Sequence, residues 1–449
     1  MRDWGTDRVA RAAGARTIAP ALGPGGPSRV VIDSREVRSG DLFVGLAGSS
    51  FDGGRFTTNA LEAGAWGVLV RPDFAQGAKG GAVLVAADPL VALQSLAKIW
   101  RRELGARVVG ITGSAGKTST KDILAALLSR ELATVASPGN LNTEVGAPLA
   151  ILGAPAGTRA LVLELAMRGA GQIAELAAIC EPDVGIIVNI GPAHLEQLGS
   201  LEAIAAAKSE MLAAMAAGGT AVIPSDEPLL DPHLPERLRV ITFGPGGDVS
   251  VVRADSGGVQ IDALGEVVSL EPGFRSAHLL QDLCAAVAAA RALDVAVSGE
   301  YDVPFSGLRG ERVELAGGVT IVNDCYNANP MSMRAALEDL ASFTPAVRRV
   351  AVLGDMLELG GEHEADYHRA LGDQATDARV LLLVTVGPLA ALAGETFIGG
   401  EHIHAENASQ AAHLLEPRLQ RGDVVLVKGS RGVGLEDVAL EIAAGRMGA

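Results

Sequence analysis

The stretch from Arg107 to Lys121, RVVGITGSAGKTSTK, combines residue types that bind phosphate. An apolar run leads into a glycine-rich turn, and Lys and Thr follow where a helix would begin. In such a turn the backbone N–H groups can surround phosphate oxygens, Lys117 can neutralise their charge, and Thr118 can ligate Mg²⁺. The strict P-loop spacing is incomplete, because Ile111 occupies the position of the first glycine. The retained Gly-Lys-Thr-Ser run still predicts a nucleotide site, whose residues are Gly113, Ser114, Ala115, Gly116, Lys117, Thr118 and Ser119.

Candidate metal ligands follow two later apolar runs. Glu164 ends the run ALVLE, and a carboxylate at the carboxyl edge of a sheet can approach a phosphate loop. Taken alone, Glu164 could equally face solvent. His194 follows DVGIIVNIGPAHL, where a neutral imidazole could bind a divalent cation or could simply be a structural loop histidine. Lys208 lies in the Ala-rich helical segment EAIAAAKSEML, and its local sequence is typical of a solvent-exposed lysine.

Three polar segments follow apolar runs in the last third of the chain. They are NDCYNANPMSM at 323–333, GDMLELG at 354–360 and VKGSRGVG at 427–434. Because each would leave the carboxyl end of a strand, we expect them at the crevice of an open sheet, where ligands bind. Turn chemistry alone also favours Asn, Asp and Gly, but three such turns at one edge favour a binding site. The candidate residues are Asp324, Asn327, Asn329, Asp355, Lys428, Ser430 and Arg431.

The elements that must position these residues alternate along the chain. From 29 to 101, short β-branched runs alternate with helix-like stretches such as Pro89–Trp100, which indicates a small α/β unit. A second unit starts with an apolar strand at 107–112, and its strands, separated by helices, should pair in parallel. Between 219 and 270, short runs separated by Gly, Asp and Pro predict sheet without long helices. The Gly-, Pro- and charge-rich stretch 298–312 is interpreted as a hinge.

The fold class predicted from this pattern is α/β, with three domains at 1–104, 105–309 and 310–449. The last domain is expected to be Rossmann-like, because strands and helices alternate through it. Its strands are expected at 319–323, 349–353, 380–386 and 424–427, and its helices at 331–341, 362–374, 409–419 and 435–444.

Composition excludes several classes of protein. A chain of 449 residues with 48% apolar side chains exceeds what one core usually organises. Its 37 Lys and Arg against 53 Asp and Glu give a formal charge of −16, which argues against nucleic-acid binding.

Cys180, Cys284 and Cys325 form no CxxC pair, so free thiols in a reducing compartment are expected. Without a signal sequence or an unbroken apolar span, we expect a cytoplasmic protein that does not contact membranes. No feature requires an oligomer, and a monomer is expected.

The ordered motifs of the chain resemble those of the Mur ligase family, over nearly all 449 residues. Besides the phosphate loop and the three polar segments, they are DSREVRSGDLFVGL and FDGGRF within 33–56, GNLNTEVGAP at 139–148, ELAMRGAGQI at 164–173 and NIGPAHLEQLGSLEAIAAAKSEM at 189–211. The resemblance implies a small N-terminal α/β domain that holds the UDP end of a substrate, a central P-loop ATPase-like domain and a C-terminal Rossmann-like domain.

The resemblance also implies an activity, which is ATP-dependent amide formation in peptidoglycan precursor synthesis. The terminal carboxylate of UDP-N-acetylmuramoyl-tripeptide would be joined to D-alanyl-D-alanine through an acyl phosphate, giving ADP and phosphate. Lys208 is then reinterpreted, because a lysine in this AKxE setting is similar to one that reacts with CO₂ to form a carbamate. The implied catalytic residues are Lys117, His194 and Lys208; the Mg²⁺ ligands Thr118, Glu164, His194 and Lys208; the further nucleotide contacts Asn140, Arg309 and Asp324; and the substrate contacts Ser34, Arg35, Asn142, Tyr326, Asn327, Asn329, Lys428, Ser430 and Arg431.

The chain departs from the family pattern at a few positions. Many relatives carry a His-Asn pair and a later Asn near residue 278, whereas this chain has Leu279 and Asp282, so its adenine contacts stay open. Arg168 stands where several relatives have a Gly-Ala-Asn-type sequence, and its role is also open.

Three alternatives to this activity stay in view. One is another amide ligase of the superfamily, adding the third amino acid or acting as a folylpolyglutamate synthase. The absence of an Asp-Asn-Pro-Arg-type segment from the last domain argues against an enzyme that selects a single amino acid. Another is a catalytically silent nucleotide-binding homologue, which the retained Lys117, Glu164 and Lys208 disfavour. A kinase that releases a phosphorylated product would have no use for a domain that binds an amine.

Overall fold

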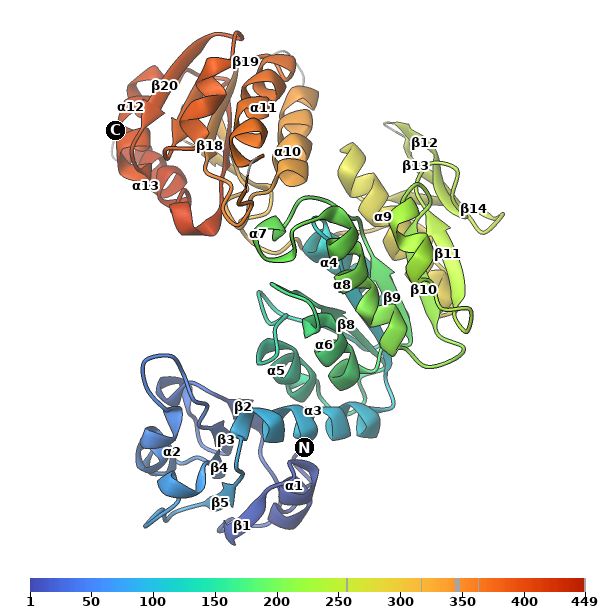
Figure 1. Cartoon of the computed structure of the whole chain (residues 1–449), viewed down its shortest axis with the longest axis vertical. Coiled ribbons are helices and arrows are strands. Elements are labelled where there is room, and N and C mark those ends of the chain that lie inside the picture. Colours follow the sequence, from blue (N-terminus) through green and yellow to red (C-terminus); the bar gives the residue numbers. More distant parts are fainter. Residues whose placement is uncertain (256, 316, 344–347, 362, 448–449) are drawn as a thin grey trace.

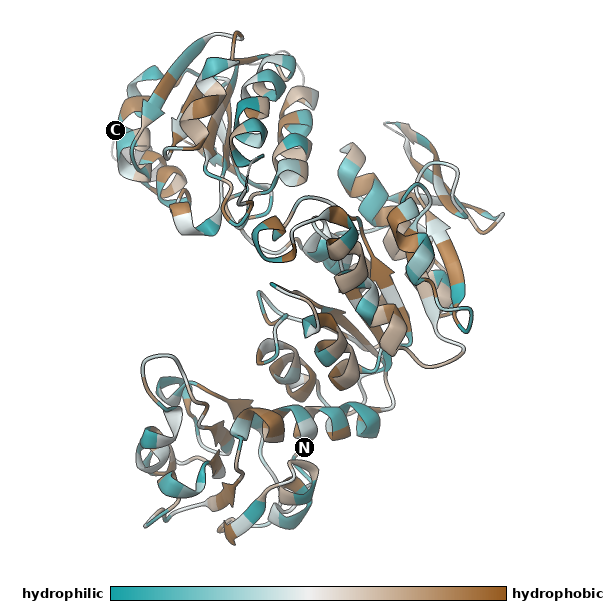
Figure 2. Cartoon of the chain, viewed as in Figure 1, coloured by the Kyte–Doolittle hydropathy of each residue, from teal (hydrophilic) through white to brown (hydrophobic). Residues whose placement is uncertain are grey.

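The computed structural model describes residues 1–449 except 256, 316, 344–347, 362 and 448–449. Three β-sheets follow one another along the chain, and helices flank each of them (Figure 1). The apolar residues concentrate in the strands of each sheet (Figure 2). This arrangement confirms the α/β fold class with three domains. The boundaries at 104/105 and 309/310 stay predictions, and we use them to name the N-terminal, central and C-terminal domains.

The N-terminal sheet has the strand order β1-β5-β4-β3-β2, and its neighbours are parallel except for β1 and β5. Its strands are β1 (Arg16–Ala19), β2 (Arg29–Val31), β3 (Asp41–Val44), β4 (Gly67–Val70) and β5 (Ala82–Val85), and its helices are α1 (Thr6–Ala12), α2 (Thr57–Glu62) and α3 (Pro89–Leu104). The side chain of Asp88 caps α3 by accepting from the backbone N–H groups of Leu90 and Val91. The indole N–H of Trp100, on α3, donates to the carbonyl of Ala154 at 3.1 Å, so α3 joins the N-terminal domain to the central one.

The central sheet has ten strands in the order β15-β14-β13-β12-β11-β10-β9-β6-β8-β7. Pairing is parallel from β7 to β12 and antiparallel for β12–β13 and β13–β14. The parallel pairing of β6, β8 and β9 confirms what the sequence predicted for strands separated by helices. The strands are β6 (Arg107–Thr112), β7 (Thr134–Ala136), β8 (Ala160–Glu164), β9 (Val184–Ile187), β10 (Thr220–Pro224), β11 (Arg239–Phe243), β12 (Val249–Asp255), β13 (Gly258–Ala263), β14 (Val267–Glu271) and β15 (Gly299–Glu300). The stretch 219–270 is therefore sheet without long helices, as expected. The predicted hinge at 298–312 is not wholly irregular, because it contains β15.

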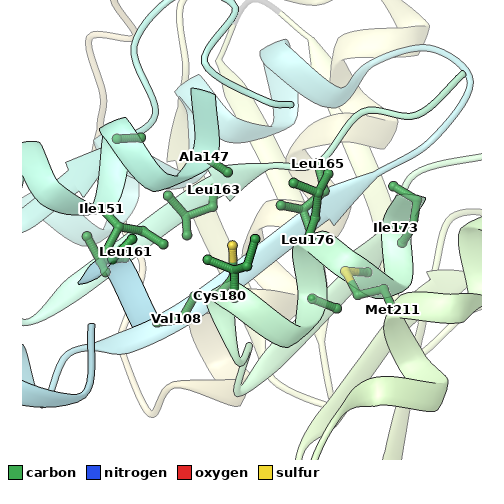
Figure 3. Packing of buried hydrophobic residues seen from close by; sticks show 14 of the residues in the cluster. Val108, Ala147, Ile151, Leu161, Leu163, Leu165, Ile173, Leu176, Cys180 and Met211 are labelled. Carbon is green, nitrogen blue, oxygen red and sulfur yellow. The ribbon is translucent and has the colours of Figure 1, made fainter. Parts of the chain in front are cut away.

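Helices cover both faces of the parallel part of the central sheet. Helices α4 (Lys117–Ser129) and α9 (Ala277–Ala292) pack together over one face, where Val109 and Ile111 of β6 point. Helices α5 (Gly146–Gly153), α6 (Gln172–Cys180) and α8 (Leu201–Ala214) cover the other face, towards which Val108 of β6 points. Figure 3 shows that layer, with Cys180 among aliphatic side chains of β6, β8 and α5. Alternate residues of one strand thus fill two separate cores, as in a sheet buried on both faces.

The C-terminal sheet has the order β16-β17-β21-β18-β19-β20 and is parallel except for β16 and β17. Its strands are β16 (Glu311–Leu315), β17 (Val319–Asn323), β18 (Arg349–Gly354), β19 (Val380–Val386), β20 (Glu401–Ala405) and β21 (Val424–Lys428). Helices α10 (Pro330–Ser342) and α11 (Glu364–Asp377) pack on one face, and α12 (Ala408–Leu415) and α13 (Glu436–Met447) on the other. The helix predicted at 409–419 is too long, because Pro417 falls in a 3₁₀ turn, Glu416–Arg418, that ends α12.

Two further expectations concern cysteines and membranes. All three cysteines are free and buried, and burial raises the pKa of each thiol to about 12. Within the described residues, no helix has both the length and the apolar character that a membrane span requires.

Candidate active site

The phosphate loop connects β6 to α4 and is held by hydrogen bonds from a neighbouring strand end. The Oδ1 atom of Asn189 accepts from the backbone N–H groups of Ser114 at 3.0 Å and Ala115 at 2.9 Å. The hydroxyl of Ser114 donates to the carbonyl of Gly191 at 2.9 Å. Gly116, the residue before α4, has a φ of 75°, and a Cβ there would lie 2.5 Å from Oδ1 of Asp282. The loop therefore has a defined shape that requires glycine at this position.

Lys117 opens α4 and extends back along this loop. Its ammonium group donates to the carbonyl of Gly113 at 2.7 Å. Burial lowers the pKa of Lys117, the nearby Glu164 opposes this shift, and the positive charge of Arg309 adds to it. A cation held in this way lies beside the N-terminus of α4, where phosphate groups are also attracted by the helix dipole.

Glu164 lies at the end of β8 and meets Thr118 from α4. The carboxylate is 2% exposed, and its Oε2 accepts from the hydroxyl of Thr118 at 2.7 Å. Its Oε1 accepts from the side-chain amide of Asn142 at 2.9 Å. Glu164 therefore faces the phosphate loop and not solvent, which resolves the alternative left open by the sequence. Thr118 and Glu164 supply two hard oxygen atoms that touch each other, as two ligands of one Mg²⁺ ion would.

Lys208 lies on α8 and is 2% exposed, so its interpretation as a solvent-exposed lysine was wrong. The local sequence led to a wrong expectation because the face of α8 that carries Lys208 packs against the central sheet and does not face solvent. Its amine makes no hydrogen bond to any described residue. Burial lowers the pKa of Lys208 well below the usual value for lysine, and the charge of Lys117 lowers it further. The neutral amine is the form of lysine that is nucleophilic.

His194 immediately precedes the short helix α7 (Leu195–Leu198) and has a φ of 60°. Its Nδ1 atom lies 2.8 Å from Oε2 of Glu358, a residue of the C-terminal domain. Burial lowers the pKa of His194, the Glu358 carboxylate opposes this, and the charges of Lys117 and Lys208 add to the lowering. The influence of both lysines places His194 in the same electrostatic environment as the phosphate loop.

Loops of the C-terminal domain complete the site from the opposite side. The side-chain amide of Asn329 caps α10 and also donates to the carbonyl of Ser114 at 3.1 Å. Two guanidinium groups lie over the ring of Tyr326, that of Arg309 at 4.0 Å and that of Arg431 at 5.7 Å from the ring centre. The phosphate loop and the C-terminal loops are therefore in direct contact.

Several predicted residues of this domain hold the loops in place. The buried ammonium of Lys428 donates to Oδ2 of Asp324 at 2.6 Å and to the carbonyl of Asn327 at 3.0 Å. The hydroxyl of Ser430 accepts from the backbone of Leu357 at 2.9 Å. Asp355 is 7% exposed and accepts from the backbone N–H of Ala390 at 2.6 Å, so it braces the loop. Sequence alone could not distinguish these bracing roles from substrate contacts.

One cleft of about 1670 Å³ lies between the central and C-terminal domains. The predicted residues that line it are Ser114, Ala115, Gly116, Lys117, Thr118, Ser119, Asn140, Asn142, Glu164, His194, Arg309, Asp324, Tyr326, Asn327, Asn329, Lys428, Ser430 and Arg431. The three positions where the family pattern departs, Arg168, Leu279 and Asp282, also line it. The predicted residues outside its lining are Gly113, Lys208, Asp355, Ser34 and Arg35.

Ser34 and Arg35 belong to the N-terminal domain, in the short 3₁₀ turn Ser34–Glu36. The guanidinium of Arg35 is exposed and pairs with Asp33 at 2.6 Å. These two residues therefore lie in a different domain from the two that form the cleft, and they are not part of its lining.

Sequence reasoning missed two residues of the site, Asn189 and Glu358. Asn189 lies two residues after the end of β9 and begins the NIGPAHL motif, so its position after a buried strand was a usable signal. Glu358 lies in the GDMLELG segment, which the sequence did single out, but its partner His194 is 164 residues away.

Comparisons with known proteins agree with this arrangement. Three family models match the chain in order: "Mur ligase family, catalytic domain" over 28–92, "Mur ligase middle domain" over 111–290 and "Mur ligase, glutamate ligase domain" over 308–431. The chain belongs to the Mur ligase family. The resemblance seen in its motifs is thereby confirmed, and the protein is an ATP-dependent amide ligase by family.

Relatives of this Mur ligase match it over almost their whole length. The UDP-N-acetylmuramoyl-tripeptide–D-alanyl-D-alanine ligase of Bacillus subtilis is 32% identical over 92% of each chain. The structure of MurF from Acinetobacter baumannii has a TM-score of 0.87 at 28% identity and covers 98% of this chain and 99% of its own. MurF ligase from Thermotoga maritima, solved in complex with ADP, has a TM-score of 0.81 at 31% identity and covers 94% and 98%.

Proposed function

We propose that this Mur ligase joins UDP-N-acetylmuramoyl-tripeptide to D-alanyl-D-alanine at the expense of ATP, in the synthesis of peptidoglycan precursors. The observation that carries the proposal is the cleft between the central and C-terminal domains, in which a phosphate loop with Lys117 faces the polar loops of the C-terminal domain. An activated carboxylate and an attacking amine can meet in such a cleft. The names of the full-length relatives and the ADP complex of the Thermotoga maritima protein support the substrates and the nucleotide.

The residues present fit a Mg²⁺ ion beside the phosphates. Thr118 and Glu164 are in contact, and His194 lies in the same charged environment. We propose that these residues hold the ion together with Lys208. When bound, Mg²⁺ would neutralise charge on the phosphate oxygens during transfer.

Lys208 is proposed to act as a carbamate. Its buried neutral amine would attack CO₂, form a nitrogen–carbon bond and release one proton, which turns a potential cation into an anion. The anion would be stabilised by the nearby Lys117, whose charge acts on Lys208 in this structure. The carbamate would thereby become a carboxylate-like partner for the ion.

The chain's own residues then account for each step of the reaction. Lys117 and the loop N–H groups bind the phosphates and stabilise charge while the γ-phosphoryl group passes to the tripeptide carboxylate. The amine of D-alanyl-D-alanine attacks the acyl phosphate, loses a proton, and expels phosphate as the amide forms. Tyr326, Asn327 and Arg431 are proposed to bind the dipeptide. Ser34 and Arg35 are proposed to bind the UDP end.

Phosphate release from ATP, with mass detection of the product, tests the proposal. Release that needs both UDP-N-acetylmuramoyl-tripeptide and D-alanyl-D-alanine, with a product heavier by the dipeptide less water, is the expected result. Release with a single amino acid would assign another family activity, and nucleotide binding without turnover would indicate a silent homologue. The proposal includes a monomeric, cytoplasmic enzyme, and sedimentation equilibrium tests the monomer.

A further inference from the structure

We propose that Glu358 is a positioning residue for His194, through which the C-terminal domain orients a ligand of the metal site in the central domain. This inference rests on the proposed function, because that function makes His194 a Mg²⁺ ligand. It assigns a purpose to Glu358 in the GDMLELG segment, whose other polar side chain, Asp355, braces the loop.

The contact between the two residues joins separate domains. Oε2 of Glu358 lies 2.8 Å from Nδ1 of His194, and the two side chains are 46% and 21% exposed. Both line the cleft. Both also have left-handed backbone conformations, with φ of 65° for Glu358 and 60° for His194. Residues other than glycine rarely adopt this conformation unless their surroundings impose it, and such residues cluster at functional sites.

The loop that carries Glu358 is fixed to the C-terminal domain. The backbone N–H of Met356 donates to Nε2 of His368 at 2.9 Å, and that of Leu357 donates to the hydroxyl of Ser430 at 2.9 Å. The carbonyl of Asp355 accepts from the backbone of Ser430 at 3.1 Å. These bonds set the backbone just before Glu358, so its carboxylate moves with the domain as a whole.

The same loop packs closely against the segment that carries His194. A Cβ at Gly360 would lie 2.8 Å from Cβ of Glu196, which belongs to α7, so the loop can approach α7 only with glycine there. Figure 1 shows α7 beside the C-terminal domain. Asn329 makes a second bridge between the domains, to the phosphate loop. The C-terminal domain thus touches the central domain at the phosphate loop and at His194.

A carboxylate at Nδ1 determines what the other imidazole nitrogen can do. A histidine that ligates a metal through one nitrogen usually directs its other N–H to a carboxylate or a carbonyl, which sets the tautomer. Nδ1 of His194 is buried, and Oε2 of Glu358 lies 2.8 Å from it, although the contact is not aligned as a hydrogen bond within the described part of the chain. With the proton kept on Nδ1, the lone pair of Nε2 is available to a cation. The ligand is oriented only while the C-terminal domain, which carries proposed dipeptide contacts, is docked.

Binding of Mn²⁺ to the protein with ADP, followed by electron paramagnetic resonance, tests this role without any turnover. We expect Glu358→Ala to weaken Mn²⁺ binding by about ten- to hundredfold, the range typical of carboxylates behind metal-bound histidines. Glu358→Gln should lose less, because its amide oxygen can still accept from Nδ1. The control is Glu395→Ala, which removes an exposed acid of the same domain paired with Arg369 and should leave Mn²⁺ binding unchanged.

The tautomer of His194 gives a second readout that loss of packing would not produce. Because the chain has eight histidines, the His194 signals of the ¹⁵N-histidine-labelled protein are assigned by comparison with a His194→Asn variant. We expect the Nδ1–H form in the wild type and in Glu358→Gln, and a mixture of tautomers in Glu358→Ala. Unchanged Mn²⁺ affinity and an unchanged His194 spectrum in Glu358→Ala would overturn the inference. Neither measurement uses the tripeptide or the dipeptide, so a wild type that fails the ligase assay would refute the proposed function separately.

Discussion

Asp282 is a buried carboxyl group whose replacement should change how stability depends on pH. It lies on α9 against the phosphate loop and is 4% exposed. Burial raises its pKa to about 7, and the hydrogen bond that it accepts from the hydroxyl of Ser119 at 2.6 Å opposes this shift. We expect Asp282→Asn to stabilise the protein relative to the wild type, increasingly so as the pH rises towards 7.

The size of the effect follows from the difference between the folded and unfolded pKa values. The unfolded side chain ionises near the ordinary value of 3.8, whereas the folded one keeps its proton up to about pH 7. The folded state therefore binds more protons between these values, and the free energy of unfolding falls there by about 1.4 kcal/mol per pH unit. Between pH 5 and pH 8, the free energy of unfolding of the wild type falls only until pH 7 is reached, so it falls by about 3 kcal/mol in total. Below pH 3.8 the stability that this protonated carboxyl group contributes is fully present. Above pH 7 it has been lost, and the free energy of unfolding no longer changes with pH through this group.

Calorimetric unfolding of wild type and Asp282→Asn at pH 5, 6, 7 and 8 measures this difference. For a domain of this size, about 3 kcal/mol corresponds to roughly 6–12 °C in the melting temperature of the central domain. The gap between variant and wild type should widen by that amount from pH 5 to pH 7 and then level off. Asp294→Asn, at an exposed residue just after the same helix, is the control and should show no such trend. A gap that is independent of pH would refute the assignment of a raised pKa to Asp282.

Three other predictions concern the cleft. Gly116→Ala should abolish ATP binding in a titration, because its Cβ would lie 2.5 Å from a carboxylate oxygen of Asp282; normal affinity would contradict the described loop. Lys208→Ala should be inactive in the ligase assay and partly recovered by small carboxylates, and activity that is independent of both CO₂ and this lysine would disprove the carbamate. Arg431→Ala should raise the apparent KM for D-alanyl-D-alanine by removing a guanidinium beside Tyr326. An effect on the KM for ATP alone would move Arg431 to the nucleotide site.

The phosphate site could be read from the sequence because its residues are contiguous. In 107–121, a strand, a turn and a helix start follow one another, and each has a local cause in apolar, glycine or polar residues. The strands of the three sheets could be predicted for the same reason, since runs of apolar residues bounded by turns are local patterns. The helix predicted at 409–419 was too long because Pro417 lies in the 3₁₀ turn that ends α12.

Tertiary structure decided the properties that depend on distant parts of the chain. Lys208 has the local sequence of an exposed lysine, yet the packing of α8 buries it and favours its neutral amine. Asn142 and Glu164, 22 residues apart, meet only because two segments converge at the end of β8. His194 and Glu358 come from different domains and meet only when those domains touch. Burial and charge contacts of this kind depend on which surfaces pack together, and a local pattern of residues does not contain that information.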